Sequence, residues 1–200
     1  MKIKLILLSL TVFFNIVSCS GQDKKESSLI SNTNNTKTLP SIIDNLIKSN
    51  KYFVKTFDIN KDGYLDKIIS STPYEGEELF IFIGDKNSNY QQVLKTINFS
   101  QDGGNQISDI KQTNNGFEIV TKFPDKGVAQ TNYYIENSNN SFILKKIKNE
   151  FYSWQDKYTN TCIQNFNFDM KNSIEVLFET IANTKENCTK RYDNNSNAIK

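Results

Sequence analysis

The chain has 200 residues, of which 37% are hydrophobic and 12% aromatic, which suits one folded domain with additional terminal segments. This composition excludes a disordered chain, which would have few aromatic residues and a large net charge. The formal charge of +2 falls to about zero if Lys2 and Lys4 leave with the N-terminal segment. A neutral chain lacks the positive field that nucleic acid binding requires, so no nucleic-acid partner is expected.

The chain contains no histidine and three cysteines. Ser–His and Cys–His nucleophiles and imidazole-bound zinc or iron are therefore excluded for this chain. Cys19 is assigned to lipid below, and two further cysteines cannot form a four-cysteine metal site. Any metal must be held by oxygen, which favours a hard cation.

The first residues have the pattern of a secretory signal peptide. Lys2 and Lys4 form a basic segment, and residues 5–17 form an apolar run interrupted by three polar residues. The run is shorter than the roughly 20 residues of a membrane-spanning helix. A cleaved signal peptide over residues 1–18 is therefore favoured, and an uncleaved membrane anchor is the alternative.

Residues 16–19 read Ile-Val-Ser-Cys, which resembles the bacterial lipobox, although Val17 is larger than the usual residue at its position. The resemblance implies cleavage before Cys19 and acylation of its sulfur and its new amino group. Several acyl chains anchor a protein stably because each buried CH₂ contributes about 0.8 kcal/mol. Ser20 stands where Asp would favour the inner membrane, so the expected location is the cell envelope, lipid-anchored to the outer membrane on its periplasmic or surface face.

A polar segment precedes the predicted domain. Residues 19–39 are rich in Ser, Asn, Thr and Lys without an apolar period, and they read as a lipidated flexible tether. A short helix is predicted from Pro40 onward. Its apolar residues, which share one helical face, are Ile42, Ile43, Leu46 and Ile47. We expect this face to pack on a sheet, with partner binding as the alternative.

From Tyr52 onward, short β segments alternate with turn signals. The predicted strands are 52–57, 66–71, 78–83, 90–98, 106–112, 117–123, 131–136 and 141–147. Residues 114–116 and 137–140 have the composition of hairpin turns, because Asn and Gly tolerate positive φ. The expected fold is mainly β, an antiparallel sheet, a sandwich or a propeller-like meander, with a short N-terminal helix.

The predicted β-rich domain spans residues 40–192, but its last part is weakly patterned. Residues 173–181 fit either a strand or a helix, because the apolar run is short. Residues 193–200 are expected to be a frayed tail.

Residues 58–66 read Asp-Ile-Asn-Lys-Asp-Gly-Tyr-Leu-Asp, with oxygen side chains at loop positions 1, 3, 5 and 9 and Gly63 at position 6. Alternate side chains of a tight loop converge, and the glycine allows the turn that directs the next carbonyl inward. Together with water, these groups give about six or seven oxygen ligands, which suits Ca²⁺ better than Mg²⁺. The predicted calcium ligands are Asp58, Asn60, Asp62, Tyr64 (through its carbonyl) and Asp66. The expected dissociation constant is about 10⁻⁴–10⁻³ M.

Ile69 occupies the position of the bidentate Glu of an EF-hand, and β patterns flank the loop, so a helix–loop–helix is not expected. The loop resembles the D-x-N-x-D-G-x-x-D loops of FG-GAP/VCBS-type β repeats, in which the ninth-position Asp, here Asp66, is a ligand. One copy does not support a multi-bladed propeller. The alternative is a metal-free hairpin turn, which would need Asp-Gly but no further oxygen ligands.

Cys162 and Cys188 are expected to pair as a disulfide in an oxidising envelope, with two buried free thiols as the alternative. An acidic run, Glu75, Glu77 and Glu78, could face a cationic protein partner, although a solvated loop is favoured.

Four aromatic residues lie close together after the last predicted strand. They are Phe151, Tyr152, Trp154 and Tyr158. Such residues can stack on sugars, but core or half-buried packing is commoner and is expected here.

The lipobox, the tether, the calcium loop, the β hairpins and the late cysteine pair together resemble calcium-loop envelope lipoproteins of Gram-negative bacteria. That group includes immunity proteins that inhibit lysozyme-like hydrolases, although the S-G-x-x-Y motif of one lysozyme-inhibitor family is absent. The resemblance implies a non-enzymatic module that binds an envelope protein, for example a peptidoglycan hydrolase. The alternatives are a structural surface lipoprotein and a carboxylate-based glycan hydrolase, for which no Asp/Glu pair stands out from the calcium ligands.

Overall fold

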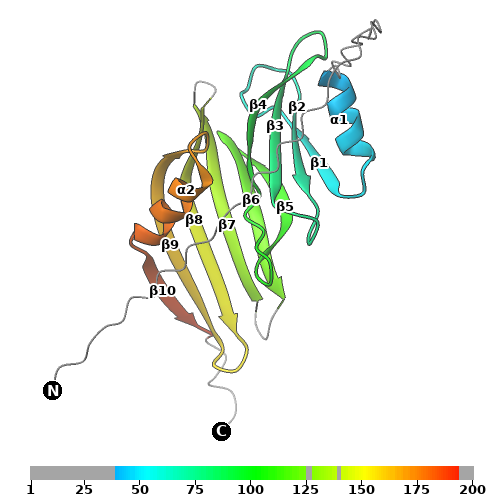
Figure 1. Ribbon diagram of the computed structural model, residues 1–200. Helices are drawn as coiled ribbons and strands as arrows, with labels where there is room; N and C mark the ends of the chain where they lie inside the picture. Colours follow the sequence, from blue (N-terminus) through cyan, green and yellow to red (C-terminus); the bar gives the residue numbers. More distant parts are fainter. Residues whose placement is uncertain (1–38, 125–127, 139–140, 194–200) are drawn as a thin grey trace, which may run out of the picture. The chain divides into compact units, whose positions relative to one another are not determined.

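The computed structural model describes residues 39–124, 128–138 and 141–193, and all of these lie in one compact unit (Figure 1). They form two antiparallel sheets, of four and six strands, and two helices. The prediction of a mainly β fold with a short N-terminal helix is confirmed, and the arrangement fits a β sandwich.

The first sheet has the strand order β1-β2-β3-β4. Its strands are β1 (Tyr52–Phe57), β2 (Asp66–Ser71), β3 (Glu78–Gly84) and β4 (Tyr90–Ile97). Strand alternation gives this sheet two apolar faces. Ile68 and Ile81 belong to the main core, whereas Ile69 and Phe80 form a second cluster.

Helix α1 (Leu39–Lys48) covers the second cluster. Ile43 is 4% exposed there and packs with Ile69, Phe80 and Phe82. The prediction that the helix packs on the sheet is therefore confirmed through Ile43 and Leu46, whereas Ile47, predicted on the same face, is 44% exposed.

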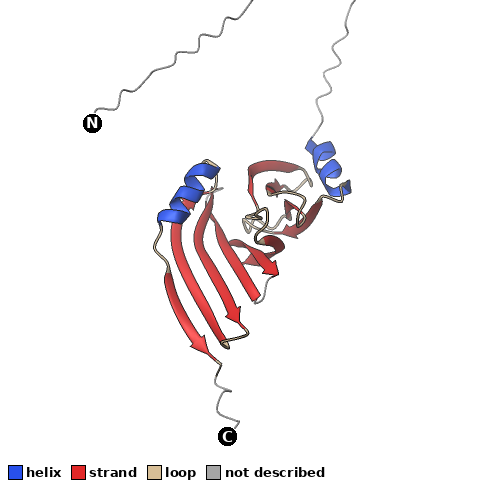
Figure 2. Cartoon of the chain, turned by 60° about the horizontal axis from the view of Figure 1, so that its bottom comes forward, coloured by secondary structure: helices blue, strands red, loops and turns tan. Residues whose placement is uncertain are grey.

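The second sheet has the strand order β10-β9-β8-β7-β6-β5, and the chain enters it after β4 (Figure 1). Its strands are β5 (Gln106–Thr113), β6 (Gly116–Pro124), β7 (Val128–Ser138), β8 (Ser141–Ser153), β9 (Tyr158–Asp169) and β10 (Asn187–Tyr192). Helix α2 (Ile174–Asn183) connects β9 to β10 and lies at one end of the sheet (Figure 2).

One face of the six-stranded sheet carries the main core. Phe117 and Ile119 of β6 pair with Ile135 and Tyr133 of β7, and all four are buried. The ring of Phe99 stacks on Tyr133 with centroids 3.8 Å apart. Burial raises the pKa of the Tyr133 hydroxyl to about 12. Residues of the first sheet and Leu177 of α2 complete this core.

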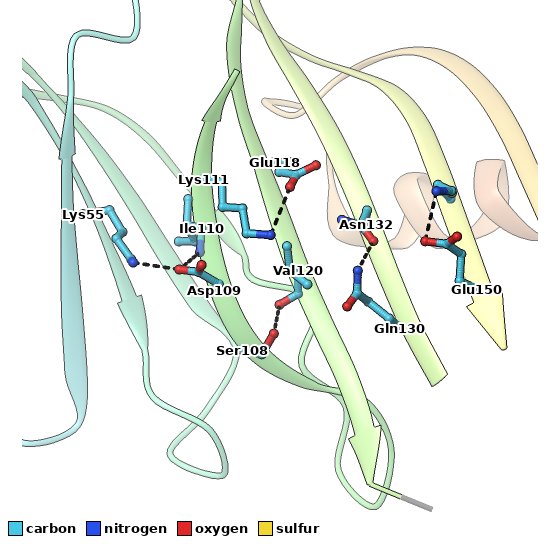
Figure 3. Close-up of polar contacts among 11 residues, drawn as sticks. Lys55, Ser108, Asp109, Ile110, Lys111, Glu118, Val120, Gln130, Asn132 and Glu150 are labelled. Atoms are coloured by element: carbon cyan, nitrogen blue, oxygen red, sulfur yellow. Dashed lines mark hydrogen bonds and ion pairs between the residues drawn. The ribbon is translucent and has the colours of Figure 1, made fainter. Parts of the chain in front are cut away.

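The opposite face of this sheet carries ordered polar contacts (Figure 3). The ammonium of Lys111 lies 3.6 Å from the Glu118 carboxylate, and the ammonium of Lys148 lies 3.0 Å from Glu150. Lys55 of β1 pairs with Asp109 of β5 at 2.7 Å, so one ion pair connects the two sheets. Along β6, Phe117 and Ile119 thus face the main core, whereas Glu118 and the buried Val120 lie on the opposite face.

The C-terminal part differs most from the sequence-based expectation. Strand β8 extends to Ser153, and β9 was not predicted as a strand. Residues 173–181 are mainly helical, with the Ser173 hydroxyl accepting a hydrogen bond from the amide of Val176 at 3.4 Å. The polar ends of β8 and β9 carried no apolar alternation from which a strand could be predicted.

Candidate metal loop

The predicted calcium loop connects β1 to β2, whose ends are joined by the pairing of Phe57 with Asp66. Two residues of the loop have positive φ, Lys61 at 62° and Gly63 at 88°. The glycine therefore adopts the backbone conformation that the sequence required of it. Lys61 supplies a second left-handed residue, which was not predicted.

Three of the predicted ligands turn toward the backbone of their own loop. The Asp58 carboxylate accepts hydrogen bonds from the amides of Asp62 and Gly63, at 3.2 and 3.0 Å. The Asn60 side-chain oxygen accepts from the amide of Asp62 at 3.1 Å. Asp62 in turn accepts from the amide of Tyr64 at 2.8 Å. These side-chain oxygens therefore share the interior of the loop.

Asp66 lies apart from that group and is fully buried, with 0% of its surface exposed. One carboxylate oxygen accepts from the amide of Ile59 at 2.8 Å, and the other accepts from the amide of Gly84 at 2.9 Å. Burial raises the pKa of the Asp66 carboxyl, and the negative charges of Asp62 and Asp58 raise it further, against the effect of the two amides. The carboxylate thus sits in a site where a nearby cation would stabilise its charged form.

The carboxylates of Asp58, Asp62 and Asp66 do not gather as closely as the ligands of a bound ion. Within residues 39–124, 128–138 and 141–193, one group of three acidic or cysteine side chains has ligand atoms within 4.8 Å of one another, and it is Cys162, Glu186 and Cys188. Both sulfurs of that group are in a disulfide, so it is not a metal site.

The loop also contacts the six-stranded sheet. The side-chain amide of Gln112 donates to the carbonyl of Asp58 at 3.0 Å, and Lys61 approaches the Asn115 side-chain oxygen at 3.5 Å. A polar cavity of about 460 Å³ lies between the loop and the ends of β6 and β7. The loop therefore bridges the two sheets, and its conformation is coupled to both.

The predicted disulfide is confirmed. Cys162 and Cys188 are bonded and face each other in register across β9 and β10. The Glu186 carboxylate lies 3.9 Å from the Cys188 sulfur. The bridge fastens β10, all of whose residues are exposed, to the rest of the sheet.

The four aromatic residues that cluster in the sequence differ in their exposure to solvent. Core or half-buried packing is correct for Tyr152 and Tyr158 but wrong for Phe151 and Trp154, which are 44% and 64% exposed. Phe151 lies at the end of β8 and Trp154 in the turn that follows, and both rings are in contact with solvent.

The three glutamates of the acidic run also differ in their contacts. Glu75 pairs with Lys51 at 3.4 Å, and Glu78 pairs with Lys95 at 2.8 Å. Glu77 instead lines a cavity together with Tyr74 and Asp102. The sequence contained a turn signal at Pro73 and Gly76 but nothing that placed this turn beside Asp102.

The predicted signal peptide, the lipid site at Cys19, the tether except Leu39, and the frayed tail except Asp193 lie outside the described residues. Leu39, assigned to the tether, is instead the first residue of α1. Neither helix in the described part of the chain has the length and apolar character that a membrane span requires. The turn predicted at residues 137–140 falls partly outside the described chain.

Comparisons with protein-family models, curated proteins and solved structures find no match to this chain.

Proposed function

We propose that the protein is an envelope lipoprotein, anchored through acylated Cys19, whose β domain binds another envelope protein without catalysing a reaction. The 58–66 loop of this domain holds Ca²⁺, which stabilises the contact between the two sheets. The partner class that we favour is a peptidoglycan hydrolase of the lysozyme type.

The observation that carries the binding function is the exposure of large side chains that could have been buried. Tyr74 is 76% exposed and Trp154 is 64% exposed, while Val176 and Phe178 of α2 are 47% and 43% exposed. Tyr and Trp are enriched among the residues that dominate protein–protein affinity. Single exposed apolar residues are ordinary, but exposed aromatic rings on rigid turns are typical of recognition surfaces.

Calcium binding is supported by the surroundings of Asp66. A fully buried carboxylate with two further acidic residues close by is destabilised by burial and by like charge. Asp58, Asn60 and Asp62 would offer side-chain oxygens, Tyr64 its carbonyl, and Asp66 the lone pairs that its amide contacts leave free. The ion would supply positive charge there, and the chain would supply oxygen ligands from one loop.

A carboxylate-based glycan hydrolase is the less favoured alternative. Glu77 and Asp102 line one cavity, but both side chains are exposed. The general acid of a glycosidase is normally desolvated, because burial keeps its carboxyl protonated at neutral pH. The surroundings of these two residues therefore favour binding over hydrolysis.

The direct test is inhibition of a panel of purified muramidases by the chain from residue 19 onward, with Cys19→Ser so that it is unlipidated. We expect at least one enzyme to be slowed in proportion to added protein, more strongly with Ca²⁺ than with EDTA. If no muramidase is slowed at a large molar excess, the hydrolase-inhibitor function is wrong. Hydrolysis of the glycan by the protein alone would support the alternative.

The anchor is tested separately. Radioactive palmitate should label the full chain expressed in a diderm bacterium, and Cys19→Ala should remove the label. Labelling that persists in Cys19→Ala, or that is absent from the wild type, would contradict the lipid anchor.

A further inference from the structure

An exposed tyrosine is held in a costly backbone conformation beside a small cavity. Tyr74, in the loop between β2 and β3, has φ of 68°. Positive φ is rare for a bulky residue and costs free energy unless the surrounding structure enforces it. Its amide donates to the side-chain oxygen of Gln106 at 3.0 Å, and Gln106 is itself buried. The chain thus fixes the ring of Tyr74 in solvent, where the ring gains no packing.

The cavity beside Tyr74 has a volume of about 310 Å³ and lies between the β2–β3 loop and the β4–β5 loop. Its walls include Tyr74, Glu77, Gln101 and Asp102. The volume is at the lower end of that of small-molecule sites, about 300–1,000 Å³, and suits one long side chain of a partner.

A buried polar network holds both loops in place. The side-chain amide of Asn98 donates to the Ser70 hydroxyl at 3.0 Å and to the Ser71 carbonyl at 3.3 Å. The Asn98 side-chain oxygen accepts from the amide of Ser100 at 2.9 Å. Asn98 is fully buried, so these bonds are protected from water and fix the geometry of the cavity.

The charge of the cavity is uncompensated. Within the described part of the chain, Glu75 and Glu78 have lysine partners, but Glu77 and Asp102 form no ion pair. None of the described residues that line the cavity is Lys or Arg. Two free carboxylates beside an exposed aromatic ring favour a cation over an anion or an apolar group.

We propose that this cavity is the surface through which the protein binds a basic protein partner, and that it accepts an arginine side chain of that partner. The guanidinium group lies between the Glu77 and Asp102 carboxylates, and its planar face lies against the ring of Tyr74. Arginine is favoured over lysine because a planar fork can bond carboxylates and stack on an aromatic ring at once. The inference rests on the proposed binding function and specifies its contact.

The test is an NMR titration of the mature chain, residues 19–200 with Cys19→Ser, using Nα-acetyl-arginine methylamide as the probe. The neutral citrulline analogue, which has the same shape, is the matched control. We expect saturable shifts of the Tyr74, Glu77 and Asp102 amides with the arginine probe and at least about tenfold weaker binding of citrulline, since a factor of ten corresponds to about 1.4 kcal/mol. Equal shifts with both probes, or shifts scattered over the surface, would overturn the proposal.

Amino-acid substitutions distinguish binding at this cavity from nonspecific attraction of the probe to acidic residues. The combined E77Q and D102N variant should reduce binding of the arginine probe by at least about tenfold, whereas E75Q, whose carboxylate pairs with Lys51, should leave it unchanged. Undiminished binding by the combined variant would contradict the proposal. If the protein binds the probe at this cavity but inhibits no muramidase, the proposed arginine-binding surface stands. Only the proposal that the partner is a lysozyme-type hydrolase is then wrong. If the wild type and the combined variant inhibit a muramidase equally, the proposal that this cavity is the binding surface is wrong. The proposed binding function would still stand.

Discussion

The carboxylate of Asp66, at the start of β2, accepts a hydrogen bond from the amide of Gly84, at the end of β3, over 2.9 Å. Its second oxygen accepts from Ile59 inside the loop at 2.8 Å. One side chain therefore ties the predicted calcium loop to the end of β3, an interior strand of the first sheet. This contact gives Asp66 a structural role in addition to the ligand role that its sequence position predicts.

Asp66→Asn should destabilise the domain. The amide group can replace one oxygen acceptor, but its NH₂ end then faces a backbone N–H and leaves that donor unpaired. Loss of a buried hydrogen bond to a charged group costs about 1.5–3 kcal/mol, although relief of the buried charge offsets part of this. Urea denaturation at neutral pH measures the difference. The control is Asp44→Asn on the exposed side of α1, and equal stability of the two variants would contradict the role of Asp66.

Calcium should raise the thermal stability of the wild type. At the expected affinity, 10 mM Ca²⁺ exceeds the dissociation constant roughly 10- to 100-fold and should stabilise the fold by about 1.4–2.7 kcal/mol. The corresponding rise in melting temperature is roughly 3–10 °C. Differential scanning calorimetry with Ca²⁺ and with EDTA measures it.

The matched variants for this experiment are Asp62→Asn and Asp85→Asn. Both aspartates accept hydrogen bonds from amides of their own turns, but Asp85 lies between β3 and β4, outside the loop. The calcium-dependent rise should shrink in Asp62→Asn and persist in Asp85→Asn. Identical melting of the wild type in Ca²⁺ and EDTA would remove the calcium site.

Reduction of the disulfide should release β10. The loop that Cys162 and Cys188 close contains all of α2, and a bridge of this span stabilises by about 3–4 kcal/mol in the chain-entropy model. The Cys162→Ser, Cys188→Ser variant should therefore unfold at lower urea, and its β10 amides should exchange faster with solvent. Amides of β6 and β7, paired on both sides, serve as the internal control. Unchanged exchange in β10 would show that the strand pairing alone holds it.

Local patterns predicted most of the β1–β7 region. The strand at residues 66–71 was found because Ile68 and Ile69 stand between turn residues, and the helix because Ile43 and Leu46 share one face. Boundaries shifted where a polar residue continued the ladder, as at Gln130, whose pairing with Glu150 is set by the neighbouring strand. Whether a strand continues in this way depends on a partner strand far along the chain. It therefore cannot be predicted from the local sequence pattern.

The same distinction between local and long-range information applies to the candidate sites. The positive φ of Gly63 followed from its place in the loop, and the disulfide followed from cysteine count and compartment. The burial of Asp66 did not, because it depends on Gly84 approaching from another strand. Likewise, Tyr74 and Asp102 are 28 residues apart in sequence and meet at one cavity only because the Asn98 network joins their loops.

Acidic pH should weaken the contribution of Glu78 to the stability of the fold. The hydrogen bond from Lys95, and then that from Tyr52, hold the pKa of the Glu78 carboxyl below its usual value. A lowered folded-state pKa contributes stability that is full above the unfolded pKa, about 4.3, and is lost as the pH falls through the folded value. Because the pair is partly exposed, we expect less than about 1 kcal/mol. Glu78→Gln should therefore be less stable than wild type at pH 7 and equal to it near pH 2. The same difference at both pH values would contradict this, and Lys95→Met should reduce the difference at pH 7.

Gly84→Ala should disturb the loop from the opposite strand. A Cβ atom at this position would lie 2.3 Å from the Leu65 carbonyl oxygen, so the backbone must move, at a cost of about 1–3 kcal/mol. The movement draws the Gly84 amide away from Asp66 and should speed hydrogen exchange at Ile59, the other donor to that carboxylate. Gly103→Ala is the matched control, because a Cβ there meets nothing within 4 Å and its φ of 67° costs only about 1 kcal/mol. We expect Ile59 exchange to rise in Gly84→Ala and not in Gly103→Ala. Equal exchange in both would mean that the loop keeps its conformation without the Gly84 contact.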